Sequence, residues 1–194
     1  KDAEETELPL ILNSGNSQSH VAYQKGMLVF NALSHYIGEE ALNRALKNYL
    51  QKVRLQKAPY TTSLEMVDFI KKETPDSMQY LIHDMFETVT YYDSKIVNLK
   101  TTEVLNSKYE VSISYLINKY EKKANAVTLL PLNDFIEIGI YKEGSFLPVE
   151  IIIVRVNKSS NHLKFQLDYN PERIAIDPHC LLIDIKRSDN NEKF

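Results

Sequence analysis

The stretch Tyr109-Glu110-Val111-Ser112-Ile113-Ser114-Tyr115-Leu116-Ile117-Asn118 decides the fold class of this 194-residue chain. Its odd positions are apolar and its even positions are mostly polar, a period of two that is typical of a strand with one buried face. Further apolar runs occur at residues 96–99, 135–140, 149–156, 163–167, 173–176 and 181–185. Short polar turns separate these runs. The second half of the chain therefore predicts about seven strands in an antiparallel, immunoglobulin-like β-sandwich.

The first half of the chain has a different period, because its apolar residues recur at spacings of three and four. Gly38 is expected just past the end of the first helix, where glycine readily adopts a positive φ. Thr62 and Glu65 fit a capping box, and Thr74 with Pro75 fits an N-cap followed by the first helical residue. We predict four helices that begin near residues 21, 39, 62 and 74. Helices followed by an antiparallel sandwich make the predicted fold class α+β.

Composition excludes several classes of protein. Hydrophobic residues make up 43% of the chain and charged residues 25%, so intrinsic disorder does not describe it. Lysine and arginine number 23 against 26 acidic residues, so there is no basic excess and nucleic acid is not an expected partner. Apolar runs such as Ile151–Val154 are far shorter than the roughly 18 residues of a membrane-spanning helix.

The histidines and the single cysteine do not form a metal-binding motif. No histidine pair has the H-E-x-x-H spacing, so we interpret each histidine as a surface or strand residue. A single cysteine excludes both an intramolecular disulfide and a multi-cysteine zinc site. Cys180 lies in the apolar run Cys180-Leu181-Leu182-Ile183, and we expect it to be a buried, inert thiol rather than a nucleophile. The histidines are His20, His35, His83, His162 and His179.

Three aspartates near the C-terminus, Asp177, Asp184 and Asp189, are close enough in sequence to suggest a calcium site. Their spacing does not match an EF-hand loop. Asp177-Pro178 and Asp189-Asn190 are typical turn dipeptides, so we interpret these aspartates as turn residues at strand ends.

The block Val21-Ala22-Tyr23-Gln24-Lys25-Gly26 opens a helix after a polar loop. By itself, a tyrosine at a helix start is a packing or surface residue. Together with later blocks, however, Tyr23-Gln24-Lys25-Gly26 resembles the gluzincin aminopeptidases, the family of alanyl aminopeptidases and leukotriene-hydrolase-like enzymes. The later blocks are Leu33, Ile37-Gly38-Glu39-Glu40, Leu42, Ala45-Leu46, Tyr49-Leu50 and Thr62.

The second half resembles the tail of a bacterial branch of that family, whose members are often attached to membrane transporter-like segments. The resemblance implies a membrane-associated parent protein. The matching blocks are Tyr91-Tyr92-Asp93, Asn133–Gly139, Ile176-Asp177-Pro178, Leu182-Ile183-Asp184 and Asp189-Asn190.

The resemblance implies that Tyr23 is catalytic. In such enzymes the tyrosine of Tyr-x-Lys-Gly points into the active site, where a protonated phenol can donate a hydrogen bond to the oxyanion that develops during peptide hydrolysis. Lys25 and Gly26 then have structural roles: Gly26 would allow close helix packing, and Lys25 would lie on the surface or pair with an acid.

The family's zinc ligands and its substrate-amine motif are absent from this sequence. We expect them upstream of Lys1, in a catalytic domain that would be a partner of this chain. The intact parent would then use one zinc ion to remove N-terminal residues from peptide substrates. This chain alone would bind no zinc and would be inactive.

These expectations define the predicted organisation. Residues 1–92 would be the helical C-terminal part of a thermolysin-like peptidase domain, and residues 93–194 the β-sandwich domain. Helices separated from their domain would expose apolar surface, so we expect the chain to self-associate. The alternative is a noncatalytic protein-interaction scaffold of helices plus sandwich, whose upstream sequence would lack the zinc ligands.

Overall fold

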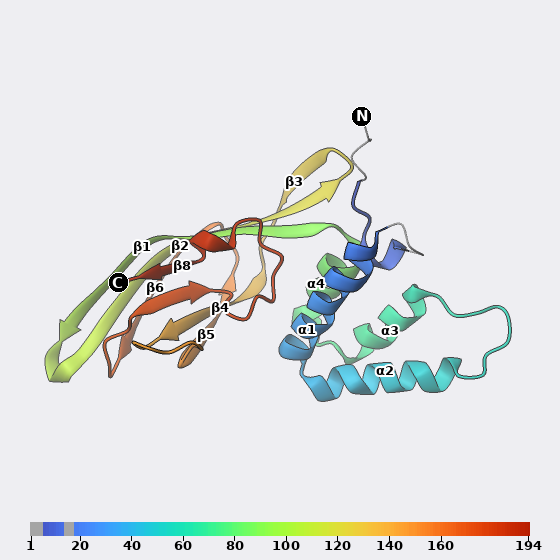
Figure 1. The fold of residues 1–194 in the computed structure, drawn as a ribbon, viewed down its shortest axis with the longest axis horizontal. Coiled ribbons are helices and arrows are strands. Elements are labelled where there is room, and N and C mark those ends of the chain that lie inside the picture. Colours follow the sequence, from blue (N-terminus) through green and yellow to red (C-terminus); the bar gives the residue numbers. More distant parts are fainter. Residues whose placement is uncertain (1–5, 14–17) are drawn as a thin grey trace. The chain divides into compact units, whose positions relative to one another are not determined.

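The computed structural model describes residues 6–13 and 18–194, and over these residues it has four α-helices and antiparallel β-sheets (Figure 1). The predicted α+β fold class is therefore confirmed. The chain divides into two compact units. The helical unit contains Lys1–Thr90 and Glu121–Val127, and the sandwich unit contains Tyr91–Tyr120 and Thr128–Phe194. The assignment of residues 1–92 to a peptidase domain stays a prediction.

The helical unit is built from short helices whose apolar faces are buried. Helix α2 packs against both α1 and α3, and Leu33, Ala45 and Ile70 from these three helices are fully or almost fully buried. No helix in the described part of the chain is long and apolar enough to cross a membrane. In chain order the elements are η1 Leu10–Leu12, the π-helix η2 His20–Lys25, α1 Gly26–Ile37, α2 Glu39–Val53, α3 Ser63–Glu73, η3 Asp76–Met78, α4 Gln79–Ile82 and the π-helix η4 His83–Glu87.

One of the predicted helix starts, at Thr74, differs from the structure. Gly38 does separate α1 from α2, with a φ of 88°. Thr74, however, closes α3: its hydroxyl donates to the Ile70 carbonyl at 2.8 Å, which satisfies one of the last carbonyls of that helix. Pro75 follows in an extended conformation, and a 3-10 turn precedes α4. The prediction that Thr74 caps a fourth helix is therefore wrong.

The predicted capping box does not form either. Thr62 is the N-cap of α3, as predicted, but among the described residues its side chain makes no capping bond. Glu65 instead accepts a hydrogen bond from the Thr61 hydroxyl at 2.6 Å and pairs with Lys52. An ion pair with α2 thus replaces the backbone contact that the sequence pattern suggested.

The sandwich unit consists of two four-stranded sheets that share one apolar core, which confirms the predicted sandwich (Figure 1). In β2, Val111, Ile113, Tyr115 and Ile117 all point into this core, as their alternation predicted. The first sheet joins β1 Thr90–Val104, β2 Lys108–Lys123 and β3 Ala126–Leu130, with β6 Ser160–Leu167 also paired to β2. The second has the order β5 Glu150–Val156, β4 Asp134–Tyr141, β7 Arg173–Ile176 and β8 Asn191–Lys193.

The predicted strand at residues 181–185 is wrong. Leu181 and Leu182 are buried, but their N–H groups donate to the Asp177 carboxylate at 2.8 and 3.1 Å. A side chain therefore satisfies backbone donors that a strand would give to a ladder. Only an isolated bridge between Tyr92 and Asp184 remains. The sequence reading also missed the short strands β3 and β8.

Candidate functional site

Tyr23 lies on the π-helix η2, which leads directly into α1. Its side chain is 77% exposed, so the phenol is presented to solvent rather than packed in the core. π-helical turns are rare and occur frequently at functional sites. A substrate group can therefore reach the Tyr23 hydroxyl, which is the first geometric requirement for a hydrogen-bond donor in catalysis. Its assignment as a catalytic residue stays a prediction.

Lys25, two residues later, has the opposite environment. Its side chain is almost completely buried, and its Nζ lies 2.9 Å from Oε1 of Glu7. Of the two roles expected for Lys25, pairing with an acid is confirmed. Since a buried ammonium needs a compensating charge, this ion pair ties η2 to the N-terminal segment.

Gln18 fixes the same segment from the other side of η2. Its side-chain Nε2 donates to the Thr6 carbonyl and its Oε1 accepts from the Leu8 N–H, both at 2.9 Å. Its own carbonyl accepts from the N–H groups of Val21 and Ala22 at 3.0 Å. Gln18 therefore connects the start of η2 to the N-terminal segment that contains Thr6 and Leu8. Sequence reasoning missed it, because a single glutamine in a polar loop carries no periodic signal.

Gly26 is buried but is not closely packed. A β-carbon at this position would meet only the Leu10 Cδ1 atom, at 4.0 Å, which is an ordinary van der Waals distance. The expectation that Gly26 allows a close helix approach is therefore wrong.

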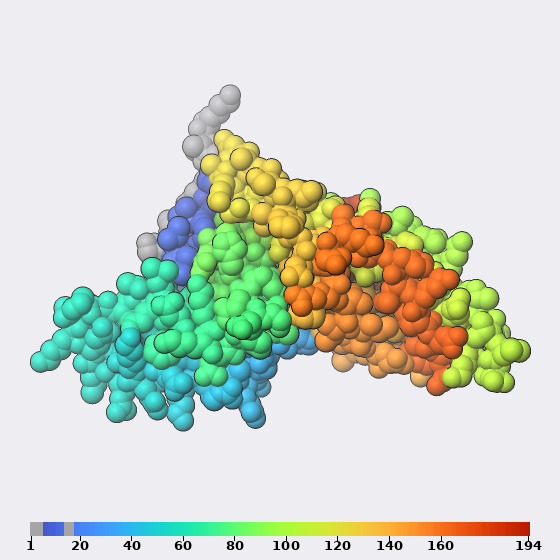
Figure 2. Space-filling view, turned by 180° about the vertical axis from the view of Figure 1, so that it is seen from behind, coloured from blue at the N-terminus to red at the C-terminus, as the bar shows by residue number. Residues whose placement is uncertain are grey.

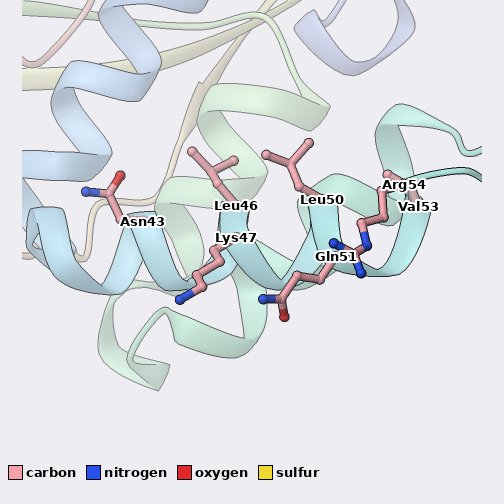
Figure 3. Close-up of a pocket in the computed structure, with 7 residues that line it drawn as sticks. All are labelled: Asn43, Leu46, Lys47, Leu50, Gln51, Val53 and Arg54. Atoms are coloured by element: carbon pink, nitrogen blue, oxygen red, sulfur yellow. The ribbon is translucent and has the colours of Figure 1, made fainter.

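A surface groove of about 490 Å³ runs along α2 (Figure 3). Leu46 and Leu50 point to one side of the helix in this view, while Lys47 and Gln51 point to the other. The groove thus combines an apolar strip with amide and basic groups, and its lining contains no acid. The lining residues are Asn43, Leu46, Lys47, Leu50, Gln51, Val53 and Arg54.

The donor groups needed for zinc do not come together inside either unit. Within the helical unit alone, and within the sandwich unit alone, no three histidine, cysteine or acidic ligand atoms of the described residues converge. Three of the histidines lie within hydrogen-bond distance of a side chain in their own unit. His83 lies 3.1 Å from Glu87, His162 lies 3.2 Å from Ser114, and His179 lies 2.8 Å from Glu137. The described residues of either unit, taken by itself, therefore do not supply the three or four converging ligands of a zinc site.

The C-terminal aspartates act as turn residues, as predicted. The Asp177 carboxylate is buried and accepts hydrogen bonds from Leu181, Leu182 and Arg187. Burial raises the pKa of Asp177, and these donors act against that rise. Asp184 likewise accepts from the N–H groups of Ser94 and Lys186 and from Asn190 Nδ2. Both carboxylates therefore organise the loop after β7.

Cys180 is exposed, so the expectation of a buried thiol is wrong. Its φ of 58° lies in the left-handed region, and the chain turns there between Asp177 and the buried Leu181. Leu181 and Leu182 of the predicted run are buried, but Cys180 at its start is not.

No protein-family model matches this chain, and no curated protein matches it. Among solved structures, it is similar to that of Legionella pneumophila aminopeptidase A in complex with aspartic acid. The TM-score is 0.48 and the sequence identity is 13%, over 81% of this chain and 17% of that chain. This chain therefore spans less than a fifth of the length of that aminopeptidase.

Proposed function

We propose that this chain is the C-terminal portion of a zinc-dependent aminopeptidase that hydrolyses N-terminal residues of peptides. Within it, Tyr23 would donate a hydrogen bond to the developing oxyanion. One observation carries the proposal: in Tyr23-Gln24-Lys25-Gly26 the tyrosine is exposed, while Lys25 and Gly26 are buried. The exposed Tyr23 is thus followed by the buried Lys25, which anchors η2 through its ion pair with Glu7, and this arrangement supports the roles that the sequence resemblance implies for both residues.

The chemistry of Tyr23 suits this role. A phenol is a hydrogen-bond donor at neutral pH and carries no charge that must be desolvated when substrate binds. One donor aimed at an oxyanion contributes roughly 2.7–4 kcal/mol of transition-state stabilisation in other hydrolases. Gln18 and the Glu7–Lys25 ion pair would keep the backbone of η2 in place while the Tyr23 side chain reaches outward.

Zinc would polarise the peptide carbonyl and activate the attacking water. The 194 residues contain no H-E-x-x-H, so its ligands would come from sequence outside this chain, which alone would be inactive. The upstream catalytic domain would then be the partner of the helical unit. We also infer from the resemblance that the longer protein is bacterial and membrane-associated.

The decisive experiment replaces Tyr23 by phenylalanine in the protein extended by its upstream sequence. Turnover of aminoacyl chromogenic peptides should fall at least about tenfold, equivalent to about 1.4 kcal/mol, while the zinc content stays unchanged. Tyr60→Phe is the matched control, since Tyr60 is 75% exposed against 77% for Tyr23. Equal turnover in both variants would remove Tyr23 from the mechanism, and an upstream sequence without zinc ligands would remove the peptidase.

The second candidate is a noncatalytic protein-interaction scaffold, and the α2 groove favours it. Leu46 and Leu50 offer apolar contact there, and Lys47 and Arg54 supply positive charge beside it. Binding energy at such a surface comes from a few buried apolar anchors. Under this alternative, Leu50→Asp would abolish partner binding in a protein that has no peptidase activity, whereas the peptidase proposal requires activity.

A further inference from the structure

The second sheet of the sandwich unit has one protected edge and one unprotected edge. Its order begins with β5 and ends with β8, and in the described part of the chain no strand pairs with the outer edge of β5. Strand β8 is only Asn191-Glu192-Lys193, short and charged, which are two of the features that discourage edge-to-edge pairing. Strand β5 spans seven residues and contains Ile151-Ile152-Ile153-Val154. It is therefore not short, and its only charges, Glu150 and Arg155, lie near its two ends.

Apolar side chains are exposed along this edge. Ile153 is 63% exposed, although it lies in the middle of a strand, and Ile151 is exposed as well. The turn that leads into β5 adds Phe146, which is 97% exposed, together with Leu147 and Val149. Figure 2 shows the segment of β5 and β6, in orange, at the surface of the protein. Single exposed apolar residues are ordinary, but a row of them on an open strand edge marks an interaction surface.

The residue pattern of β5 allows the strand to pair with the same strand of a second copy. In an antiparallel pair about a two-fold axis perpendicular to the sheet, facing residues share the same side of the sheet. Full overlap of residues 150–156 then places Ile153 opposite Ile153 of the second copy, and Ile151 opposite Arg155. The two charges of the strand, Glu150 and Arg155, lie at opposite ends. In this antiparallel register Glu150 faces Val156 and Arg155 faces Ile151 of the other copy, so no like charges oppose each other. In-register parallel pairing would instead set Glu150 beside Glu150 and Arg155 beside Arg155.

We propose that β5 pairs antiparallel with β5 of a second copy of this chain, in the register centred on Ile153. The pairing joins the second sheets of the two sandwich units through backbone hydrogen bonds. It also removes Ile151, Ile153 and the preceding apolar turn from water. Isoleucine and valine favour extended conformations, so the strand needs no rearrangement to pair. This inference does not depend on the peptidase role proposed above.

The first test compares charge insertions at two equally exposed positions in the 194-residue chain. Sedimentation over a range of concentrations should show a dimer, and Ile153→Lys should raise its dissociation constant at least about tenfold, equivalent to about 1.4 kcal/mol. The lysine acts strongly because the two-fold axis sets it beside its own copy. Leu64→Lys is the control, because Leu64 is 60% exposed but lies in the helical unit, outside the α2 groove. The control should leave the dissociation constant unchanged, and circular dichroism verifies that both variants are folded.

The second test determines directly which residues of the two β5 strands face each other. In a Cys180→Ser background, Ile153→Cys should form an intermolecular disulfide under mild oxidation. Facing residues of an antiparallel pair have Cα atoms about 4.5–5.5 Å apart, within the range that a disulfide spans. Leu129→Cys in the same background is the control, because Leu129 is 61% exposed on β3.

Three results would each overturn the proposal. The first is a chain that stays monomeric at every concentration. The second is a dimer that Leu64→Lys disrupts and Ile153→Lys does not, which would locate the contact in the helical unit. The third is a Leu129→Cys variant that cross-links as readily as Ile153→Cys, which would indicate random collision.

Discussion

The ion pair between Lys25 and Glu7 shows how one residue can hold a functional segment without taking part in its chemistry. The Lys25 side chain is 8% exposed and the Glu7 side chain 35% exposed, so the two partners are desolvated to different extents. The pair joins residues eighteen positions apart in the sequence. Because its acid lies in a segment without helical periodicity, the sequence indicated only that Lys25 could pair, not with which residue.

This asymmetry predicts unequal costs for breaking the pair. Glu7→Gln leaves the nearly buried ammonium without its counter-charge, and the free energy of unfolding should fall by about 1.5–3 kcal/mol. Lys25→Met should cost less, because the methionine side chain fills the space of the lysine stem and Glu7 can still be hydrated. Urea denaturation of both variants measures the difference. A larger loss for Lys25→Met would contradict this account of the pair.

At the scale of elements, the two glycines at the ends of α1 differ in whether the backbone requires glycine. Gly38 has a φ of 88°, which L-residues adopt only with strain, whereas Gly26 has a helical φ of −55°. A β-carbon fits at both positions, since it would meet nothing within 4 Å at Gly38 and only Leu10 at Gly26. The two positions therefore differ in backbone conformation and not in the space available for a side chain.

Alanine substitutions should consequently act in opposite directions. Gly38→Ala should lower the free energy of unfolding by about 1–2 kcal/mol, because alanine must adopt the positive φ. Gly26→Ala should raise it by about 0.5–1 kcal/mol, because alanine loses less conformational entropy than glycine in a helix. Thermal unfolding of the two variants tests this, and a destabilising Gly26→Ala would mean that the site is more crowded than the structure shows.

The elements also show which features a sequence can predict. The alternating burial of β2 and the end of α1 at Gly38 were predicted correctly, because each depends on residues that are neighbours in the sequence. The strand expected at residues 181–185 failed, because the Asp177 side chain takes up its backbone donors. The N-cap expected at Thr74 failed for the same kind of reason, since its hydroxyl donates backward to Ile70. Side-chain bonds to the backbone thus account for both errors.

At the scale of the whole molecule, the division into units is not contiguous in sequence. Residues Glu121–Val127 belong to the helical unit although they lie between strand residues of the sandwich, and the Lys122 N–H donates to the Val89 carbonyl at 2.9 Å. Periodicity gives the type of each element but not its spatial neighbours. The candidate site shows the same limit: the sequence located Tyr23 by resemblance, but the contacts of Gln18 with Thr6 and Leu8 emerged only from the structure.

The acid stability of the whole chain should depend on Glu87. A hydrogen bond from Lys71, and then one from His83, lower the pKa of Glu87 from 4.5. A lowered folded-state pKa gives stability that is present above the unfolded value and is lost as the pH falls through the folded value. Glu87→Gln should therefore destabilise the protein at pH 6, and this difference should be smaller at pH 3, which is below the unfolded value of 4.5. Denaturation curves at both pH values test this.

Asp177 affects the pH dependence of stability in the opposite direction to Glu87, so the two effects must be separated. Burial raises its pKa above 3.8, so its contribution to stability grows as the pH falls through the folded value. The wild type and Glu87→Gln share this contribution, so it cancels in their difference. The hydrogen bonds described for the two carboxylates involve different residues: Lys71 and His83 for Glu87, and Leu181 and Leu182 for Asp177. A mutational difference that stays constant from pH 6 to pH 3 would show that the Glu87 contacts do not form.

The exposed turn at Cys180 has a practical consequence. It carries the only thiol in the 194-residue sequence. A maleimide dye or nitroxide would therefore attach at one defined position on the native protein, with no engineered cysteine and no competing site. Because this position lies in the loop that the Asp177 carboxylate organises, the signal of such a reporter would follow the order of that loop in solution.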